Sequence, residues 1–169
     1  MSAPRLAAVL HGARWPTDDA GAAWRQRLSR ALQREVDIVL ARDEPGSPRG
    51  AAACIADALG RTMAPHVLVA DVHATPDDET LQTLVAALTD AALVVPTAPP
   101  ADRPAVDGDR WSARLRAAAA GESAPRFVEA PVWTVQREAV IDAGGLDAAL
   151  WSYGTLDDLA VRLTRIGAP

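Results

Sequence analysis

The stretch His66-Val67-Leu68-Val69-Ala70-Asp71-Val72-His73-Ala74-Thr75-Pro76 decides how the rest of the sequence is interpreted. Its apolar run, 67–70, is typical of a buried strand, and an Asp-x-His pair follows at the carboxyl end. Side chains two positions apart on a strand point to the same face, so Asp71 and His73 can converge on one point. In open α/β sheets, ligands bind at the carboxyl ends of the strands. The stretch therefore predicts a binding site at Asp71 and His73.

A helix is expected directly after this stretch. Thr75 can cap its amino end, Pro76 suits its first turn, and Asp78 stands where a capping-box acid would stand. Leucine or valine then recurs at positions 81, 84, 85 and 88. This spacing predicts an amphipathic helix that packs on the sheet.

Strands and helices alternate over most of the remaining sequence. Strands are expected over 6–10, 36–41 and 91–96, and helices over 22–33 and 50–63. A loop over 97–108, a helix over 109–120, an extended segment over 126–135, and helices over 137–143 and 156–166 follow. The helices would bury apolar stripes that include Trp24, Leu28, Ala31, Leu32, Ile55, Leu59 and Met63. The alternation predicts an α/β fold, with a mostly parallel sheet covered by helices on both faces.

Composition limits the function classes. At 169 residues the chain is expected to form a single domain, 1–169, and its net charge of -5 argues against binding to nucleic acid. All 17 basic residues are arginine, so Schiff-base lysine chemistry and a Walker lysine are excluded. The single cysteine, Cys54, cannot form an intrachain disulfide and is expected in the core. Without a leader-like segment or an apolar run near the roughly 18 residues of a membrane span, we expect a cytoplasmic protein.

Two blocks of the sequence resemble the inverting family 2 glycosyltransferases. The first is the central stretch, where these enzymes carry Asp-x-Asp at a strand end; Asp71-Val72-His73 is similar to the Asp-x-His variant of the polypeptide N-acetylgalactosaminyltransferases. The second runs from Trp133 through Gly144-Gly145-Leu146-Asp147 to Asp158-Leu159-Ala160-Val161-Arg162-Leu163. The resemblance implies a three-layer, Rossmann-like GT-A fold that binds a nucleotide-diphosphate sugar.

The resemblance also implies roles for individual residues. Asp71 would contact the donor ribose or a divalent cation, Mn²⁺ or Mg²⁺, and His73 would be a direct metal ligand. Asp43 would contact the nucleotide base or ribose, and His11 at the end of the first strand could touch the base. For the catalytic base, the nearest carboxylates are Asp157 and Asp158.

The sequence departs from this family at several places. The Glu-Asp pair expected just before the Asp-Leu-x-x-Arg run is replaced by Thr155 and Leu156, and the turn after the first strand is His11-Gly12-Ala13. Thr155 to Asp158 also fits a capping box, so Asp158 has a structural interpretation and Asp157 is the better candidate base. A turn residue is the alternative for His11, and a solvated loop is the alternative for Asp43.

Three functions remain open at this stage. The first is inverting transfer of a sugar to an unknown hydroxyl acceptor, a small molecule or a glycan, with a divalent metal. The second is an inactive GT-A-like binding or assembly module, supported by the missing Glu-Asp pair. The third and weakest is a metal-dependent phosphoesterase built on Asp71 and His73. A second copy of the chain or a partner chain could complete the acceptor site.

Overall fold

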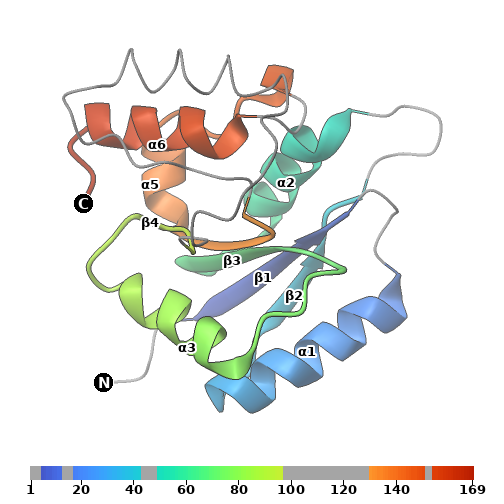
Figure 1. Cartoon of the computed structure of the whole chain (residues 1–169). Coiled ribbons are helices and arrows are strands. Elements are labelled where there is room, and N and C mark those ends of the chain that lie inside the picture. Colours follow the sequence, from blue (N-terminus) through green and yellow to red (C-terminus); the bar gives the residue numbers. More distant parts are fainter. Residues whose placement is uncertain (1–4, 13–16, 43–48, 97–129, 151–153) are drawn as a thin grey trace, which may run out of the picture.

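The sheet at the centre of the molecule has five strands in the order β2-β1-β3-β5-β4 (Figure 1). The computed structural model describes residues 5–12, 17–42, 49–96, 130–150 and 154–169, and the account below refers to them. The strands are β1 (Leu6–His11), β2 (Asp37–Leu40), β3 (His66–Asp71), β4 (Leu93–Val94) and β5 (Val132–Gln136). β1 pairs in parallel with β2 and β3, while β5 runs antiparallel to both β3 and β4. The expected mostly parallel sheet is confirmed.

Helices cover both faces of the sheet, which gives three layers. Below it in Figure 1 lie α1 (Asp18–Leu32) and α3 (Asp78–Ala87). Above it lie α2 (Gly50–Arg61), α5 (Arg137–Asp142) and α6 (Thr155–Arg165), with a short 3-10 turn, η1 (Ala148–Leu150), between the last two. This is the arrangement predicted from the alternation of apolar strands and amphipathic helices.

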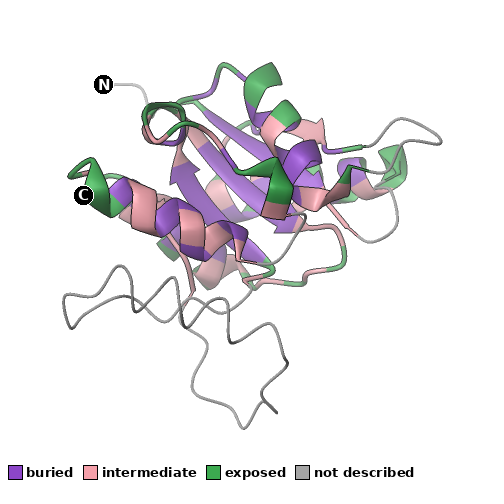
Figure 2. Cartoon of the chain, turned by 90° about the horizontal axis from the view of Figure 1, so that it is seen from above, coloured by how far each residue is buried: buried purple, intermediate pink, exposed green. Residues whose placement is uncertain are grey.

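Strand alternation divides the core into two apolar layers. Residues Leu6, Ala8 and Leu10 of β1 face α1 and α3, whereas Val9 faces the layer formed with α2, α5 and α6. Figure 2 shows the strands as the most completely buried part of the chain, with helix surfaces exposed outside them. A fully buried leucine stabilises the folded state by about 1.5–3 kcal/mol, so these layers account for the fold. Cys54 is buried among them, as expected.

Several expected element boundaries differ from the structure. Helix α3 is capped by Asp77, whose side chain accepts a hydrogen bond from the Thr80 amide at 2.7 Å, and not by Thr75. Helix α6 has Gly154 at its cap position with no side-chain cap, so Thr155 is the first helical residue and not a capping residue. Helix α2 ends at Arg61, and Met63, expected in the core, is 81% exposed.

Other expectations refer partly or wholly to residues outside the described ranges. These are the loop over 97–108, the helix over 109–120, the start of the extended segment over 126–135, and Asp43. Within the described residues, no helix is long and apolar enough to cross a membrane.

Candidate functional site

The carboxyl ends of β1 and β3 lie side by side and bring His11 next to Asp71. These two residues are paired in the parallel register of the strands, and the Val72 amide donates to the His11 carbonyl at 2.6 Å. His11 and Asp71 follow Leu10 and Ala70, which face α1 and α3. Because side chains alternate along a strand, both residues belong to the opposite face, which α2 and α6 cover. The sequence did not indicate that His11 and Asp71 would be direct neighbours.

The Asp71 carboxylate organises the turn that carries His73. β3 ends at Asp71, and Val72 and His73 lie in a turn, so the shared strand face expected for Asp71 and His73 is not the reason that they lie close. Instead, Oδ1 of Asp71 accepts a hydrogen bond from the His73 amide at 2.8 Å, and the Ala74 amide donates to the Asp71 carbonyl at 2.9 Å. His73 is exposed and Asp71 is half-buried. A short side-chain oxygen that accepts from the amide two residues on is a common turn device.

Burial lowers the pKa of His11 below its ordinary value, and the nearby negative charge of Asp71 opposes this shift. Burial is the larger of the two causes. It lowers the pKa because removing the charged imidazolium from water is unfavourable. A neutral imidazole can donate a hydrogen bond from one ring nitrogen and accept one, or bind a metal, at the other. His11 therefore brings a neutral polar group to this edge of the sheet.

Helix α6 points its amino end toward the same edge. Its carboxyl end is held near the start of β4, because the Ala92 amide donates to the carbonyl of Pro169 at 2.6 Å. β4 runs in the direction of β3, so its start lies at the edge where β3 begins. The first turn of α6, with Asp157 and Asp158, is therefore directed toward the edge that carries His11 and Asp71 (Figure 1).

The two carboxylates of this first turn have different environments. Asp157 lies on the buried side of α6 and is 7% exposed. Asp158 accepts hydrogen bonds from Arg162 Nε at 2.9 Å and Nη2 at 2.6 Å. Arg162 also donates to the carbonyl of Gly145 at 2.6 Å and to that of Ala143, which ties α6 to the turn after α5. Asp158 is thus engaged by Arg162 in a contact between α6 and the turn after α5, which gives it a structural role.

Several further residues around this edge were not predicted from the sequence. Arg42 follows β2 and forms an ion pair with Asp18 at 2.7 Å, at the start of α1. Trp24 and Arg27 of α1 donate to backbone carbonyls on the two sides of His73. The rule that functional residues follow strand ends could have indicated Arg42, which comes two residues after Leu40. No sequence signal pointed to the contacts of Trp24 and Arg27, which join residues 48 and 47 positions apart.

The donor set at the turn fits a cation that is shared with a bound phosphate. Among the described residues, no group of three or more His, Cys, Asp or Glu side chains could hold a metal ion. Asp71 and His73 bring a carboxylate and an imidazole to one turn, in which Oδ1 of Asp71 accepts from the His73 amide. Ions that bridge substrate phosphates in proteins often use only one or two protein carboxylates, and imidazole suits Mn²⁺ better than Mg²⁺.

Comparison with known proteins defines the class of fold. No protein-family model matches this sequence, and no curated protein matches it. Among solved structures, it is similar to the mannosyltransferase PcManGT from Pyrobaculum calidifontis in complex with GDP-Man and Mn²⁺, at 18% identity and a TM-score of 0.59. The aligned region covers 98% of this chain and 53% of that chain. The chain therefore has the Rossmann-like GT-A fold that the resemblance implied.

Two further structures show the same fold at lower similarity. They are the bifunctional IspDF from Campylobacter jejuni (13% identity, TM-score 0.57) and S. aureus TarS 1-349 (11% identity, TM-score 0.51). The matches cover 98% and 97% of this chain, and 48% and 56% of the respective neighbours. The chain thus spans about half the length of the structures that it matches.

Proposed function

We propose that this protein binds a nucleotide-diphosphate sugar, together with a divalent cation, at the edge formed by His11, Asp71 and His73. The observation that carries the proposal is the turn in which Asp71 accepts from the His73 amide at the end of β3. This turn presents a carboxylate and an exposed imidazole at the sheet edge where α/β folds bind their ligands. The likeness to a fold that holds GDP-Man and Mn²⁺ in one neighbour supports the same choice of ligands.

In this proposal, different residues of the chain have different roles in sugar transfer. Asp71 and His73 would hold Mn²⁺ or Mg²⁺, and the cation would neutralise the diphosphate leaving group. Neutral His11 would hydrogen-bond to the nucleotide, and Asp43 would contact its base or ribose. Asp157 would accept the proton of the acceptor hydroxyl as that oxygen bonds to the anomeric carbon with inversion. The bond to the diphosphate breaks in the same step, and its electron pair leaves with the nucleotide.

A second function is a GT-A-like binding or assembly module without catalysis. The ion pair between Asp158 and Arg162 favours it, because it engages one of the two carboxylates available as a base. Asp157, the other, is 7% exposed. The acceptor, the oligomeric state and the cytoplasmic location stay expectations under both functions.

Thermal denaturation with UDP- and GDP-sugars, with and without Mn²⁺, tests the binding step. A ligand at 100 times its Kd that binds only the native state stabilises it by about 2.7 kcal/mol, which is easily measured. We expect a Mn²⁺-dependent rise in Tm that the double variant Asp71→Asn/His73→Gln abolishes. If no donor raises the Tm of the natural protein in either condition, the proposal is wrong.

Donor hydrolysis separates the enzyme from the module. Asp157→Asn should abolish release of the sugar while the Tm shift with donor and Mn²⁺ persists. Asp147→Asn is a matched control, because Asp147 is an exposed acid of the same C-terminal block. Binding of donor without turnover in the natural protein would favour the module.

A further inference from the structure

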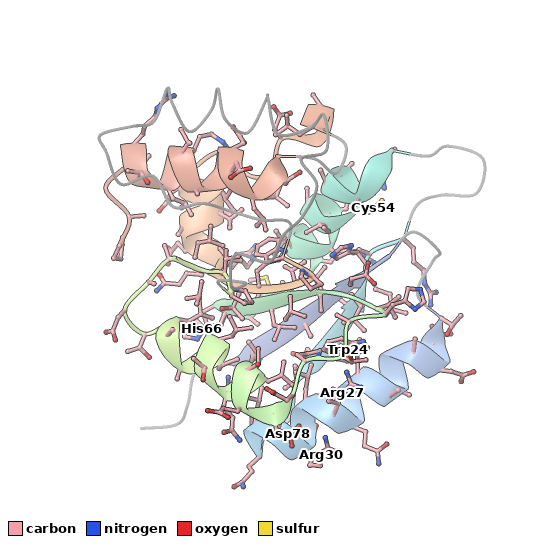
Figure 3. All side chains as sticks on the ribbon, viewed as in Figure 1. Trp24, Arg27, Arg30, Cys54, His66 and Asp78 are labelled. Carbon is pink, nitrogen blue, oxygen red and sulfur yellow. The ribbon has the colours of Figure 1, made fainter. Side chains whose placement is uncertain are left out.

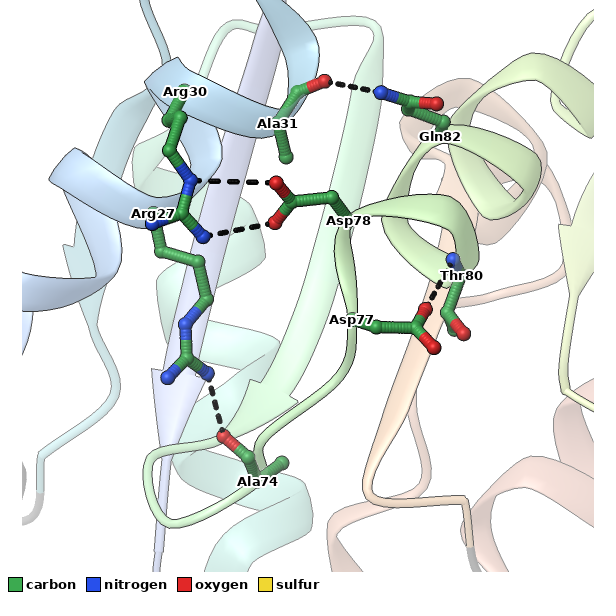
Figure 4. A network of polar contacts seen from close by, with 8 residues as sticks. All are labelled: Arg27, Arg30, Ala31, Ala74, Asp77, Asp78, Thr80 and Gln82. Atoms are coloured by element: carbon green, nitrogen blue, oxygen red, sulfur yellow. Dashed lines mark hydrogen bonds and ion pairs between the residues drawn. The ribbon is translucent and has the colours of Figure 1, made fainter.

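Two side chains of α1 donate hydrogen bonds to the backbone of the turn that carries His73. Trp24 donates its indole N–H to the carbonyl of Val72 at 3.0 Å, and Arg27 donates from Nη1 to the carbonyl of Ala74 at 3.2 Å. These two carbonyls flank His73 in the sequence. Figure 3 shows Trp24 and Arg27 on α1, and Figure 4 shows the contact between Arg27 and Ala74 from close by.

Trp24 and Arg27 also fix each other. The guanidinium carbon of Arg27 lies 5.3 Å from the centre of the Trp24 ring, within the range of a cation–π contact. Trp24 is 4% exposed and packs in the apolar layer between α1 and the sheet. A buried ring has few alternative rotamers, so the indole N–H and the stacked guanidinium keep fixed positions next to the carbonyls of Val72 and Ala74.

The turn is therefore fixed from both sides. On one side, the Asp71 carboxylate accepts from the His73 amide, and on the other, α1 engages the carbonyls of Val72 and Ala74. Both carbonyls are thus engaged by donors on α1, while His73 between them is exposed. Removing an outer-shell group that hydrogen-bonds to a metal ligand typically changes metal affinity 10- to 100-fold, which gives the scale for a restraint on the backbone of the ligand.

We propose that Trp24 and Arg27 are positioning residues, which hold the His73 turn so that His73 and Asp71 can bind one cation together. The role in cation binding rests on the proposed function, whereas the restraint on the turn does not. Trp24 and Arg27 act through the backbone of the turn and touch neither the cation nor the nucleotide.

Three variants of α1 test this proposal. Trp24→Phe keeps an aromatic ring in the core and removes the indole donor, and Arg27→Gln removes the guanidinium. Arg30→Gln is the matched control: Arg30 lies on the same helix and pairs with Asp78 at 3.0 Å, so the variant loses an exposed ion pair but no carbonyl of the turn. Arg27→Lys keeps a positive charge that can reach the Ala74 carbonyl, and serves as the conservative rescue.

Two readouts are needed, and the first is made without ligand. Amide hydrogen exchange at His73 and Ala74, measured by NMR, should become faster in Trp24→Phe and Arg27→Gln than in the natural protein or Arg30→Gln. The second readout is the Kd for Mn²⁺, alone and with GDP or UDP, measured by the loss of the free-Mn²⁺ EPR signal. We expect it to rise about 10-fold or more in both variants, and Arg27→Lys to recover most of the loss.

The outcomes distinguish the positioning role from the proposed function. Unchanged exchange at His73 and Ala74 in both variants overturns the restraint on the turn, and Arg27→Gln decides this even if Trp24→Phe fails to fold. Faster exchange with unchanged Mn²⁺ affinity overturns the positioning role. If the natural protein binds neither Mn²⁺ nor the nucleotides, the proposed function is wrong and the role in binding falls with it. Faster exchange in the two variants would then still support the restraint itself.

Discussion

Arg162 of α6 donates to the carbonyl of Gly145 at 2.6 Å while it holds Asp158, one turn earlier on its own helix, in an ion pair at 2.6 Å. Gly144 and Gly145 have positive φ values of 87° and 82°, which glycine adopts without strain. The glycine pair therefore turns the chain after α5, and the carbonyls of Ala143 and Gly145 meet the guanidinium. The conspicuous Gly-Gly and Asp-Leu-x-x-Arg patterns are thus two halves of one structural contact.

Arg162→Gln should lower the free energy of unfolding by about 1.5–3 kcal/mol, the range for hydrogen bonds to charged groups. The side chains of Arg162 and Asp158 are 24% and 20% exposed, so water replaces the lost partners poorly. Urea denaturation monitored by tryptophan fluorescence measures the change. Arg165→Gln, an exposed arginine of the same helix, is the control and should lie within about 0.5 kcal/mol of the natural protein. Equal stability of both variants would contradict the structural role of Arg162.

The cap of α3 gives a second prediction. Asp77→Ala should lower the Tm, because the Thr80 amide loses the carboxylate that caps the helix, whereas Thr75→Ala should leave the Tm unchanged. The hydrogen bonds to Thr80 lower the pKa of Asp77 below its ordinary value of 3.8. A carboxylate with a depressed pKa stabilises the fold above its unfolded pKa, and this contribution is lost as the pH falls through the folded value. The Tm difference between Asp77→Ala and the natural protein should therefore shrink below about pH 4.

The same cap shows where reasoning from sequence reached its limit. The segment Thr75-Pro76-Asp77-Asp78 offers two overlapping cap positions, two residues apart, and local rules favoured the first. Asp78 forms an ion pair with Arg30, and Arg27 binds the Ala74 carbonyl (Figure 4). These contacts join the segment to α1, and the helix begins at Asp78 after the Asp77 cap. Helix α1 ends at Leu32, 43 residues before Thr75, so no local rule takes its contacts with this segment into account.

Strands and apolar helix faces were predictable because burial of one face places apolar residues at the spacing of the strand or helix. The apolar pattern of β1, β3 and α3 appears in the structure at the expected positions. The prediction that Met63 is buried was wrong, because α2 ends at Arg61, two residues before Met63. Thr62 is extended, and its side chain accepts a hydrogen bond from the Ala64 amide at 3.1 Å. The proline at 65 was the available signal for this ending.

The candidate site was predictable in position and not in its internal contacts. Strand-end rules placed Asp71 and His11 at one edge, and the structure pairs them. The contacts of Trp24, Arg27 and Arg162 join distant segments and depend on how helices pack, which no local pattern encodes. Whether these residues act on a nucleotide sugar stays a prediction for the experiments above.

Glycine 21 provides a test of the packing between α1 and β2. A Cβ atom at Gly21 would lie 3.3 Å from Cδ2 of Leu40 and 3.6 Å from Cγ2 of Ile38. Gly21→Val should therefore destabilise the fold by about 1–3 kcal/mol through overpacking. Gly60 is the control, because nothing lies within 4 Å of its added Cβ; Gly60→Ala should stabilise α2 by about 0.5–1 kcal/mol. If urea denaturation gives the same free energy of unfolding for Gly21→Val and the natural protein, α1 lies farther from β2 than these distances indicate.

The stability of the protein should also depend on pH through His66 at the start of β3. Burial is the larger cause that lowers its pKa below 6.5, and the positive charge of Arg34 adds to the shift. A lowered pKa means that the unfolded chain binds the proton first, so this contribution to stability is present above about pH 6.5 and is lost as the pH falls toward the folded pKa. His66→Gln should therefore weaken the fall in Tm between pH 7 and 5 without removing it, because burial lowers the pKa of His11 as well. Arg34→Gln should raise the pKa of His66 in an NMR titration, but not to its ordinary value, because burial persists. A His66 pKa unchanged by Arg34→Gln would show that the two side chains lie too far apart to interact.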